Sequence, residues 1–170
     1  MTPEFSRPLP VASLPARGVT RAIRAEAPER EALARRLGLL ALDRLEAEVT
    51  AKPLANGRLV RVEGRLSADL VQECVVSLAP VPAQLAETFT AFFGEEEASA
   101  DPADEVDVPF DADLPEPIED GAVDLGELVA QHLSLALDPY PRAPGASFEA
   151  PPAEGPPSPF AALAARRGRR

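Results

Sequence analysis

Residues 44–69 read Arg-Leu-Glu-Ala-Glu-Val-Thr-Ala-Lys-Pro-Leu-Ala-Asn-Gly-Arg-Leu-Val-Arg-Val-Glu-Gly-Arg-Leu-Ser-Ala-Asp, and this stretch decides the fold. Apolar and polar residues alternate before Asn56 and Gly57, and the alternation resumes after them. A period of two is typical of a strand with one buried face, and Asn-Gly favours a tight hairpin turn. The stretch therefore predicts two antiparallel strands. The side chains expected to face the core are Leu45, Ala47, Val49, Ala51, Val60, Val62, Leu66 and Ala68.

Three further strands are predicted around this hairpin. Residues 20–24 form a short one, and residues 85–93 form a long one after a turn bracketed by Pro80 and Pro82. Residues 106–114 alternate apolar side chains with carboxylates, and Pro109 in the middle favours an edge position for this strand.

Two helices complete the predicted domain. The first begins near Pro28, which suits a first-turn position, and ends at Gly38, a natural C-cap. The second covers 124–137, with Asp124 as N-cap and Glu127 expected to complete a capping box. Two helices on an antiparallel sheet of about four or more strands make an α+β domain, which we place at residues 1–148. Residues 149–170 are interpreted as an extended Pro-rich linker with a basic tail.

Composition limits the classes of function. The net charge of −11 is unevenly distributed, because residues 95–120 hold 12 acidic side chains and no basic one. Such an acidic block argues against wrapping of RNA or DNA by the whole surface. One cysteine, no leader-like N-terminus and no run of 18 apolar residues favour a cytoplasmic protein that does not contact membranes.

Three sequence motifs resemble those of one protein family. Residues 123–142 read Val-Asp-Leu-Gly-Glu-Leu-Val-Ala-Gln-His-Leu-Ser-Leu-Ala-Leu-Asp-Pro-Tyr-Pro-Arg, residues 72–81 read Gln-Glu-Cys-Val-Val-Ser-Leu-Ala-Pro-Val, and residues 158–165 read Ser-Pro-Phe-Ala-Ala-Leu-Ala-Ala. Together they are similar to the YceD family, the large ribosomal RNA subunit accumulation proteins, in the form found in alphaproteobacteria. The resemblance implies a role in synthesis, processing or stability of large-subunit ribosomal RNA.

The same resemblance raises the question of zinc. Many relatives place a second cysteine three residues after the first, whereas this chain has Cys74 followed by Ser77. A structural zinc site needs four N or S ligands, and Cys74 and His132 supply two. We therefore expect no metal and no cofactor. Cys74 is interpreted as a small buried hydrophobe, and His132 as a packed or boundary residue on the helix.

Two charged segments are the candidate contact sites. The tail residues Arg166, Arg167, Arg169 and Arg170 are candidates for contact with RNA phosphates. Four more arginines, Arg21, Arg24, Arg35 and Arg36, are candidates for a basic patch near the first helix. The carboxylates Asp107, Asp111 and Asp113 on the acidic strand are candidates for contact with a basic protein.

The sequence contains no known catalytic motif, so no catalytic residue is predicted. We therefore expect a non-enzymatic ribosome biogenesis factor whose partner is a large-subunit rRNA precursor or a ribosomal protein. Two alternatives stay open. One is an acidic protein-binding module that chaperones a basic ribosomal protein. The other is an RNA-processing enzyme that uses clustered carboxylates and Mg²⁺.

Overall fold

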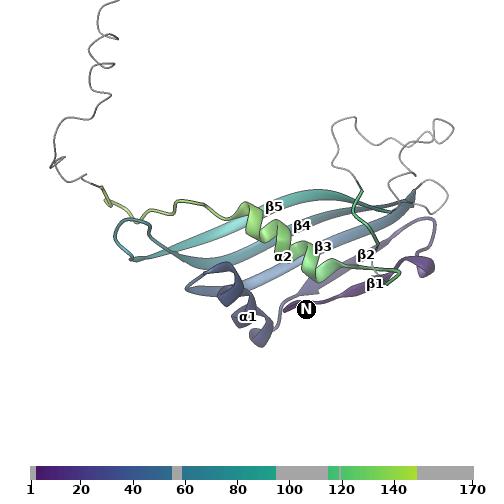
Figure 1. Cartoon of the computed structure of the whole chain (residues 1–170), viewed down its shortest axis with the longest axis horizontal. Coiled ribbons are helices and arrows are strands. Elements are labelled where there is room, and N and C mark those ends of the chain that lie inside the picture. The colour runs from purple at the N-terminus through teal and green to yellow at the C-terminus, as the bar shows by residue number, and fades with distance from the viewer. Residues whose placement is uncertain (1–2, 55–58, 95–114, 119, 149–170) are drawn as a thin grey trace, which may run out of the picture.

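The computed structural model describes residues 3–54, 59–94, 115–118 and 120–148. Its main body is an antiparallel sheet with the strand order β2-β3-β4-β5, so β2 and β5 are the edge strands (Figure 1). The strands are β2 (Val19–Arg24), β3 (Ala41–Leu54), β4 (Leu59–Glu73) and β5 (Pro80–Gly94). Strands β3 and β4 form the hairpin that the alternation in residues 44–69 predicts.

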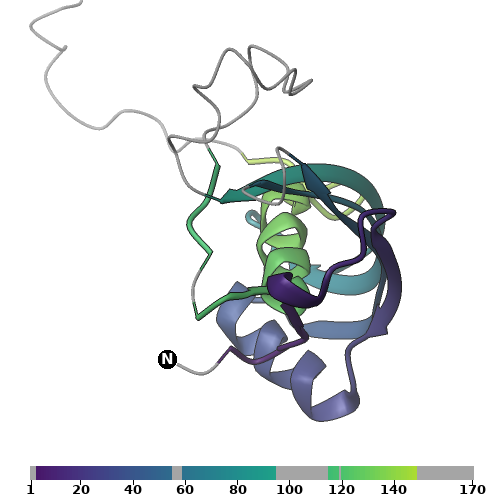
Figure 2. The same ribbon diagram turned by 90° about the vertical axis from the view of Figure 1, so that its right-hand side faces the viewer.

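Two helices pack on one face of this sheet, which curls around them (Figure 2). They are α1 (Ala27–Leu37) and α2 (Leu125–Ala136). All eight side chains predicted to face the core from the hairpin are buried, and they join apolar residues of both helices in one cluster. The α+β class with two packed helices is therefore confirmed for the part of the chain that the structure describes.

A second, two-stranded sheet was not predicted. Strand β1 (Pro8–Pro10) pairs antiparallel with β6 (Ala122–Asp124), and a short 3₁₀ helix, η1 (Val11–Ser13), follows β1. Each strand has three residues, and β1 contains two prolines, so neither carries a recognisable period. This pairing brings the N-terminal segment against the start of α2.

The prediction of a turn at Pro80 and Pro82 is wrong. Both prolines belong to β5, where they lie opposite Glu73 and Val71 of β4. Proline is tolerated on an edge strand when its missing N–H would have pointed away from the neighbouring strand. The turn instead occupies the residues between Glu73 and Pro80.

Several predicted features lie outside the described residues. These are the turn at Asn56 and Gly57, the acidic strand at 106–114 with Pro109, and the linker and tail at 149–170. Of the described helices, none is long and apolar enough to cross a membrane.

The predicted helix ends are confirmed except for one side chain. Gly38 closes α1 with a left-handed backbone (φ 66°), and Asp124 caps α2 by accepting the N–H groups of Gly126 and Glu127. The expected capping box at Glu127 is wrong, because its carboxylate instead receives the guanidinium of Arg36 at 2.6 and 2.8 Å. A long-range ion pair between the two helices has replaced a local contact.

Candidate functional site

The turn between β4 and β5 is held by its own backbone. The N–H of Cys74 donates to the carbonyl of Ala79 at 2.9 Å, and the N–H of Leu78 donates to the carbonyl of Cys74 at 3.0 Å. Leu78 adopts a left-handed conformation (φ 59°), which is unusual for a residue with a large side chain. The turn therefore presents the Leu78 side chain outward, where it is 67% exposed.

The segment that follows α2 is fastened to this turn. The N–H of Val75 donates to the carbonyl of Pro141 at 2.9 Å. The side-chain amide of Gln72 donates to the carbonyl of Asp138 at 2.8 Å. Residues 72–81 and 138–143 therefore lie side by side, so two of the three sequence motifs that resemble the family meet at one end of the sheet. We call this region the Cys74 end.

Cys74 lies at the centre of this junction. It is fully buried, as predicted, and its sulfur accepts the N–H of Ala143 at 3.3 Å and the N–H of Ser77 at 3.4 Å. These donors stabilise the thiolate, and they lower the pKa of the Cys74 thiol to about 6. The sulfur therefore links the turn to the segment after α2. Sequence reasoning missed this role, because the decisive donor is a backbone N–H 69 residues away.

The geometry favours hydrogen bonds over metal ligation at this sulfur. Ser77 lies three residues after Cys74, and its backbone N–H points at the sulfur of Cys74. In the parts of the chain that the structure covers, no three His, Cys, Asp or Glu side chains lie close enough to hold a metal ion. The absence of zinc stays a prediction.

The Cys74 pKa predicts a pH-dependent stability. The folded thiol loses its proton near pH 6, whereas an unfolded thiol loses it near about 8.5. Between these values the unfolded chain binds more protons, so this group stabilises the fold increasingly as pH rises and contributes nothing below pH 6. The difference in Tm between wild type and Cys74→Ala should therefore widen from pH 6 to 8.5. Cys74→Ser is the control, because it lacks a titrating thiol. A difference in Tm between wild type and Cys74→Ala that stays constant from pH 6 to 8.5 would refute the buried thiolate.

Large exposed apolar side chains gather around the Cys74 end. Leu78 and Val75 lie in the turn, and Tyr140 lies in the segment bonded to it. Leu40 donates its N–H to Val71, three residues before Cys74. In the described ranges, the large hydrophobic side chains that are exposed are Leu40, Val75, Leu78, Leu135, Tyr140 and Phe148. Four of these six, Leu40, Val75, Leu78 and Tyr140, belong to or adjoin the Cys74 end, and such a concentration is typical of an interaction surface.

His132 is a boundary residue, as the sequence predicted. Its ring stacks on Phe89 of β5 with ring centroids 4.1 Å apart. Burial lowers the pKa of His132 below its ordinary value, so the ring is neutral near pH 7. The contact fixes α2 against the sheet.

The four arginines of the predicted patch lie on two neighbouring elements of the chain, with Arg35 and Arg36 in the last turn of α1. Arg21 and Arg24 belong to β2, and Arg24 pairs with Glu46 at 3.6 Å. Arg36 contacts both Glu127 and Glu4, and hydrogen bonds to these carboxylates raise its pKa. Arg36 therefore joins α1, α2 and the N-terminal segment, and its guanidinium is already occupied.

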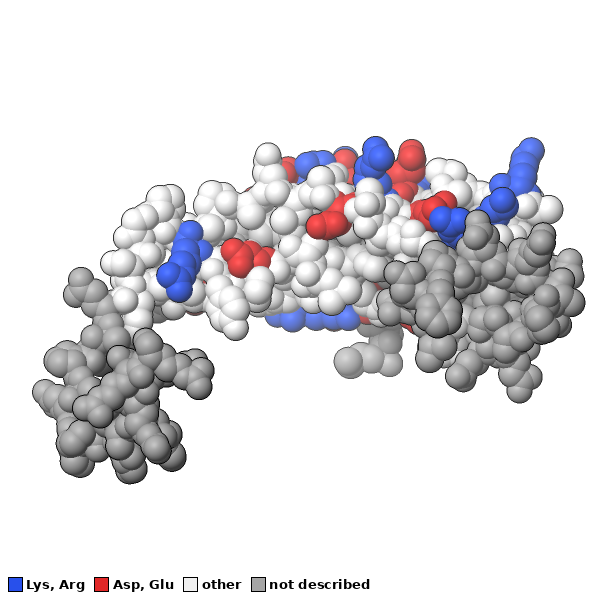
Figure 3. Space-filling model, turned by 90° about the horizontal axis from the view of Figure 1, so that it is seen from above, with Lys and Arg blue, Asp and Glu red and all other residues white. Residues whose placement is uncertain are grey.

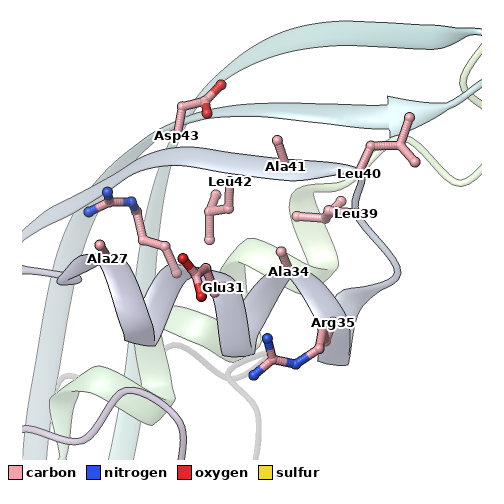
Figure 4. A pocket seen from close by; sticks show the side chains of 10 residues that line it. Ala27, Glu31, Ala34, Arg35, Leu39, Leu40, Ala41, Leu42 and Asp43 are labelled. Carbon is pink, nitrogen blue, oxygen red and sulfur yellow. The ribbon is translucent and has the colours of Figure 1, made fainter.

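A hollow of about 400 Å³ lies between α1 and the start of β3 (Figure 4). Arg30, Arg35, Glu31 and Asp43 line it together with alanines and leucines. Arg30 donates to the carbonyl of Ala25 at 2.8 Å, so one of the two guanidinium groups has a structural partner. The mixture of two cations and two carboxylates gives the hollow no preference for a ligand of either charge.

Both charged segments predicted as contact sites lie outside the described residues. These are the tail with Arg166, Arg167, Arg169 and Arg170, and the acidic strand with Asp107, Asp111 and Asp113. Their roles therefore stay predictions.

A family model described as "Large ribosomal RNA subunit accumulation protein YceD" matches residues 62–165. The match includes β5, α2 and both segments that meet at the Cys74 end. No curated protein and no solved structure matches the chain. Because the matched residues make up more than half of the 170, the chain belongs to the YceD family of large ribosomal RNA subunit accumulation proteins.

Proposed function

We propose that this protein, of the form found in alphaproteobacteria, is a non-enzymatic cytoplasmic factor that promotes synthesis, processing or stability of large-subunit ribosomal RNA. The match to the family model over residues 62–165 is the observation that carries the proposal. The exposed apolar side chains at the Cys74 end support action by binding, because they offer contact area without reactive groups.

A carboxylate and Mg²⁺ enzyme is the less favoured alternative. Such an enzyme needs carboxylates that converge on one metal. In the described ranges, Asp124 accepts the backbone N–H of Arg7, and Glu127 and Glu29 receive Arg36 and Arg7. These three carboxylates hold structure, and the acidic strand with Asp107, Asp111 and Asp113 lies outside the described residues.

Depletion of the protein in cells tests the proposal directly. Sucrose gradients of the depleted strain should show a loss of large subunits relative to small subunits, together with less large-subunit rRNA. Affinity purification with and without RNase then separates two routes. Partners that survive RNase are bound through protein, and partners that RNase removes are tethered through RNA. An unchanged ratio of the two subunits after depletion would refute the proposed function.

The arginine tail gives a quantitative prediction. Replacing Arg166, Arg167, Arg169 and Arg170 with Gln should weaken RNA binding and reduce its salt dependence. Each lost phosphate contact should lower the slope of log K against log salt by about 0.7 to 0.9. The measurement is RNA binding over a salt series. Charge-neutral variants at Asp107, Asp111 and Asp113 are the control, which should leave RNA binding intact and weaken a basic protein partner. A wild-type slope for the Gln tail would exclude phosphate contact by these arginines.

A further inference from the structure

The outer edge of β5 has an unusual character for an exposed strand. β5 is 15 residues long, and Glu87 is its only charged residue. Its register with β4 continues without a shift from one end to the other. Long, regular and weakly charged edges are ready templates for another strand. Figure 3 views the molecule from the β5 side of Figure 1, where uncharged side chains make up most of the surface.

Hydrogen bonds to Glu116 reveal which backbone groups face this edge. The N–H of Gly94 donates to the carbonyl of Glu116 at 2.9 Å, and the N–H of Glu116 donates to the carbonyl of Phe92 at 2.8 Å. Backbone groups of successive strand residues alternate between the two sides of a strand. The even-numbered residues of β5 therefore face outward, and the odd-numbered residues bond to β4.

This parity also explains the prolines and defines a window. Pro80 and Pro82 are even-numbered, so their missing N–H groups lie on the outer edge and cost β4 no hydrogen bond. The prolines blunt one end of the edge, and Glu116 occupies the other. Between them, Gln84, Ala86, Thr88 and Thr90 present N–H and C=O groups, and no described residue is hydrogen-bonded to their outer side.

Helix α2 provides an apolar shelf beside this window. Leu128 lines the same hollow as Phe93, and His132 stacks on Phe89, so α2 runs antiparallel to β5. Leu135 follows His132 by three residues, about 4.5 Å along the helix axis, so it lies toward the Leu85 end of β5 from the stack on Phe89. Leu135 is 80% exposed. An added strand would cover it with the side chains that point to the inner face of the sheet.

We propose that the β5 edge between Gln84 and Thr90 binds an extended basic segment of another protein, which joins the sheet as a fifth strand. Main-chain hydrogen bonds provide the affinity in this mode of recognition, and alternate side chains provide the specificity. Glu87 selects a Lys or Arg directly opposite it, and Leu85 and Leu135 select aliphatic neighbours two residues away.

A second copy of this chain does not suit the same edge. An antiparallel self-pair that uses the whole window from Gln84 to Thr90 places Glu87 opposite Glu87 of the other copy. Like charges directly opposite each other destabilise a strand pair. With a basic partner, the electrostatic interaction at Glu87 is attractive instead of repulsive. The inference that the basic segment belongs to a ribosomal protein rests on the proposed function. The inference that the β5 edge binds a basic segment does not depend on it.

The probe is the capped peptide Ser-Val-Thr-Lys-Thr-Val-Ser, whose pattern reads the same in both directions. Paired with the window, it places Lys opposite Glu87 and both valines on the inner face. Titration of the full-length protein followed by amide NMR should shift the signals of Gln84, Ala86, Thr88 and Thr90. The same peptide with Glu in place of Lys should bind about fivefold more weakly or worse. The charge-reversed variant Glu87→Lys should instead bind the Glu peptide more tightly than the Lys peptide.

Two matched variants test the backbone contacts. Thr88→Pro removes an outward N–H without breaking a bond to β4, and it should abolish peptide binding. Thr88→Val keeps the N–H and should bind like wild type. Equal affinity for the Lys and Glu peptides would overturn the proposal. Slow amide exchange along the window in the free monomer would also overturn it, because the chain's own residues would then cover the edge. A dimer that Thr88→Pro dissociates would assign the edge to a second copy.

Complementation of the depleted strain separates this inference from the proposed function. Thr88→Pro should fail to restore large-subunit rRNA, whereas Thr88→Val should restore it. Full restoration by Thr88→Pro in a strain that requires the protein would leave the proposed function intact and refute the β5 edge. If rRNA levels are normal after depletion and the protein still binds the Lys peptide selectively, the ribosomal partner is refuted, whereas the β5 edge remains a binding surface.

Discussion

Replacing Gly126 with valine should lower the free energy of unfolding by about 3 kcal/mol. Gly126 lies in the first turn of α2, and a Cβ there would come within 2.4 Å of the carbonyl oxygen of Phe5. The clash is with backbone, which cannot rotate away, so the N-terminal segment must move and uncover the fully buried Phe5. Valine is a better helix former than glycine by a few tenths of a kcal/mol, and this gain is too small to compensate.

Ser134→Val is the matched control, because Ser134 is exposed on the same helix. Its free energy of unfolding should stay within about 0.5 kcal/mol of wild type. Urea denaturation of both variants provides the measurement. Equal stability of the two valine variants would show that the close approach of Phe5 to α2 is wrong.

Replacing Phe89 with alanine should lower the free energy of unfolding by about 3 to 4 kcal/mol. The Phe89 ring covers Gly64 on β4, where a Cβ would lie only 2.1 Å from the ring. The same ring stacks on His132 of α2. Its removal therefore leaves a cavity between sheet and helix, and no side chain at Gly64 can fill it. Denaturation measures the loss of stability, and Thr90→Ala on the exposed face of the same strand should cost much less.

The pKa of His132 provides an independent readout of the same substitution. Burial lowers this pKa in the wild type, so loss of the covering ring should raise it toward the ordinary value. An NMR titration of the single histidine measures the change in both proteins. An unchanged pKa together with unchanged stability would contradict the packing of α2 on β5.

Two exposed regions of the molecule are proposed to bind partners, the Cys74 end and the β5 edge. The Cys74 end carries apolar side chains on a turn held by a sulfur with two N–H donors. The β5 edge carries backbone groups to which no described residue is hydrogen-bonded, and one carboxylate, Glu87. Both regions lie within residues 62–165, the part of the chain that matches the family model. Contacts made there are therefore the first to test for a role shared by the family.

The hairpin and both helices were determined by the sequence alone. Their signals are local, because strict alternation places Val49 and Val62 on one face, and Asp124 and Gly38 mark helix ends through their own backbone preferences. Burial of Cys74 and the boundary position of His132 were also correctly predicted, since both follow from the parity or face of a single element.

Only the tertiary structure decided the features that depend on partners distant in the chain. Glu127 turned from its own helix end to Arg36, 91 residues away, because a bidentate guanidinium contact replaced a local hydrogen bond. The sulfur of Cys74 found its main donor at Ala143, and the three-residue strand β1 found β6. Pro80 and Pro82 joined a strand because the side of β5 that lacks their N–H groups faces away from β4. Periods and propensities describe one element at a time, whereas these contacts arise only when elements are packed together.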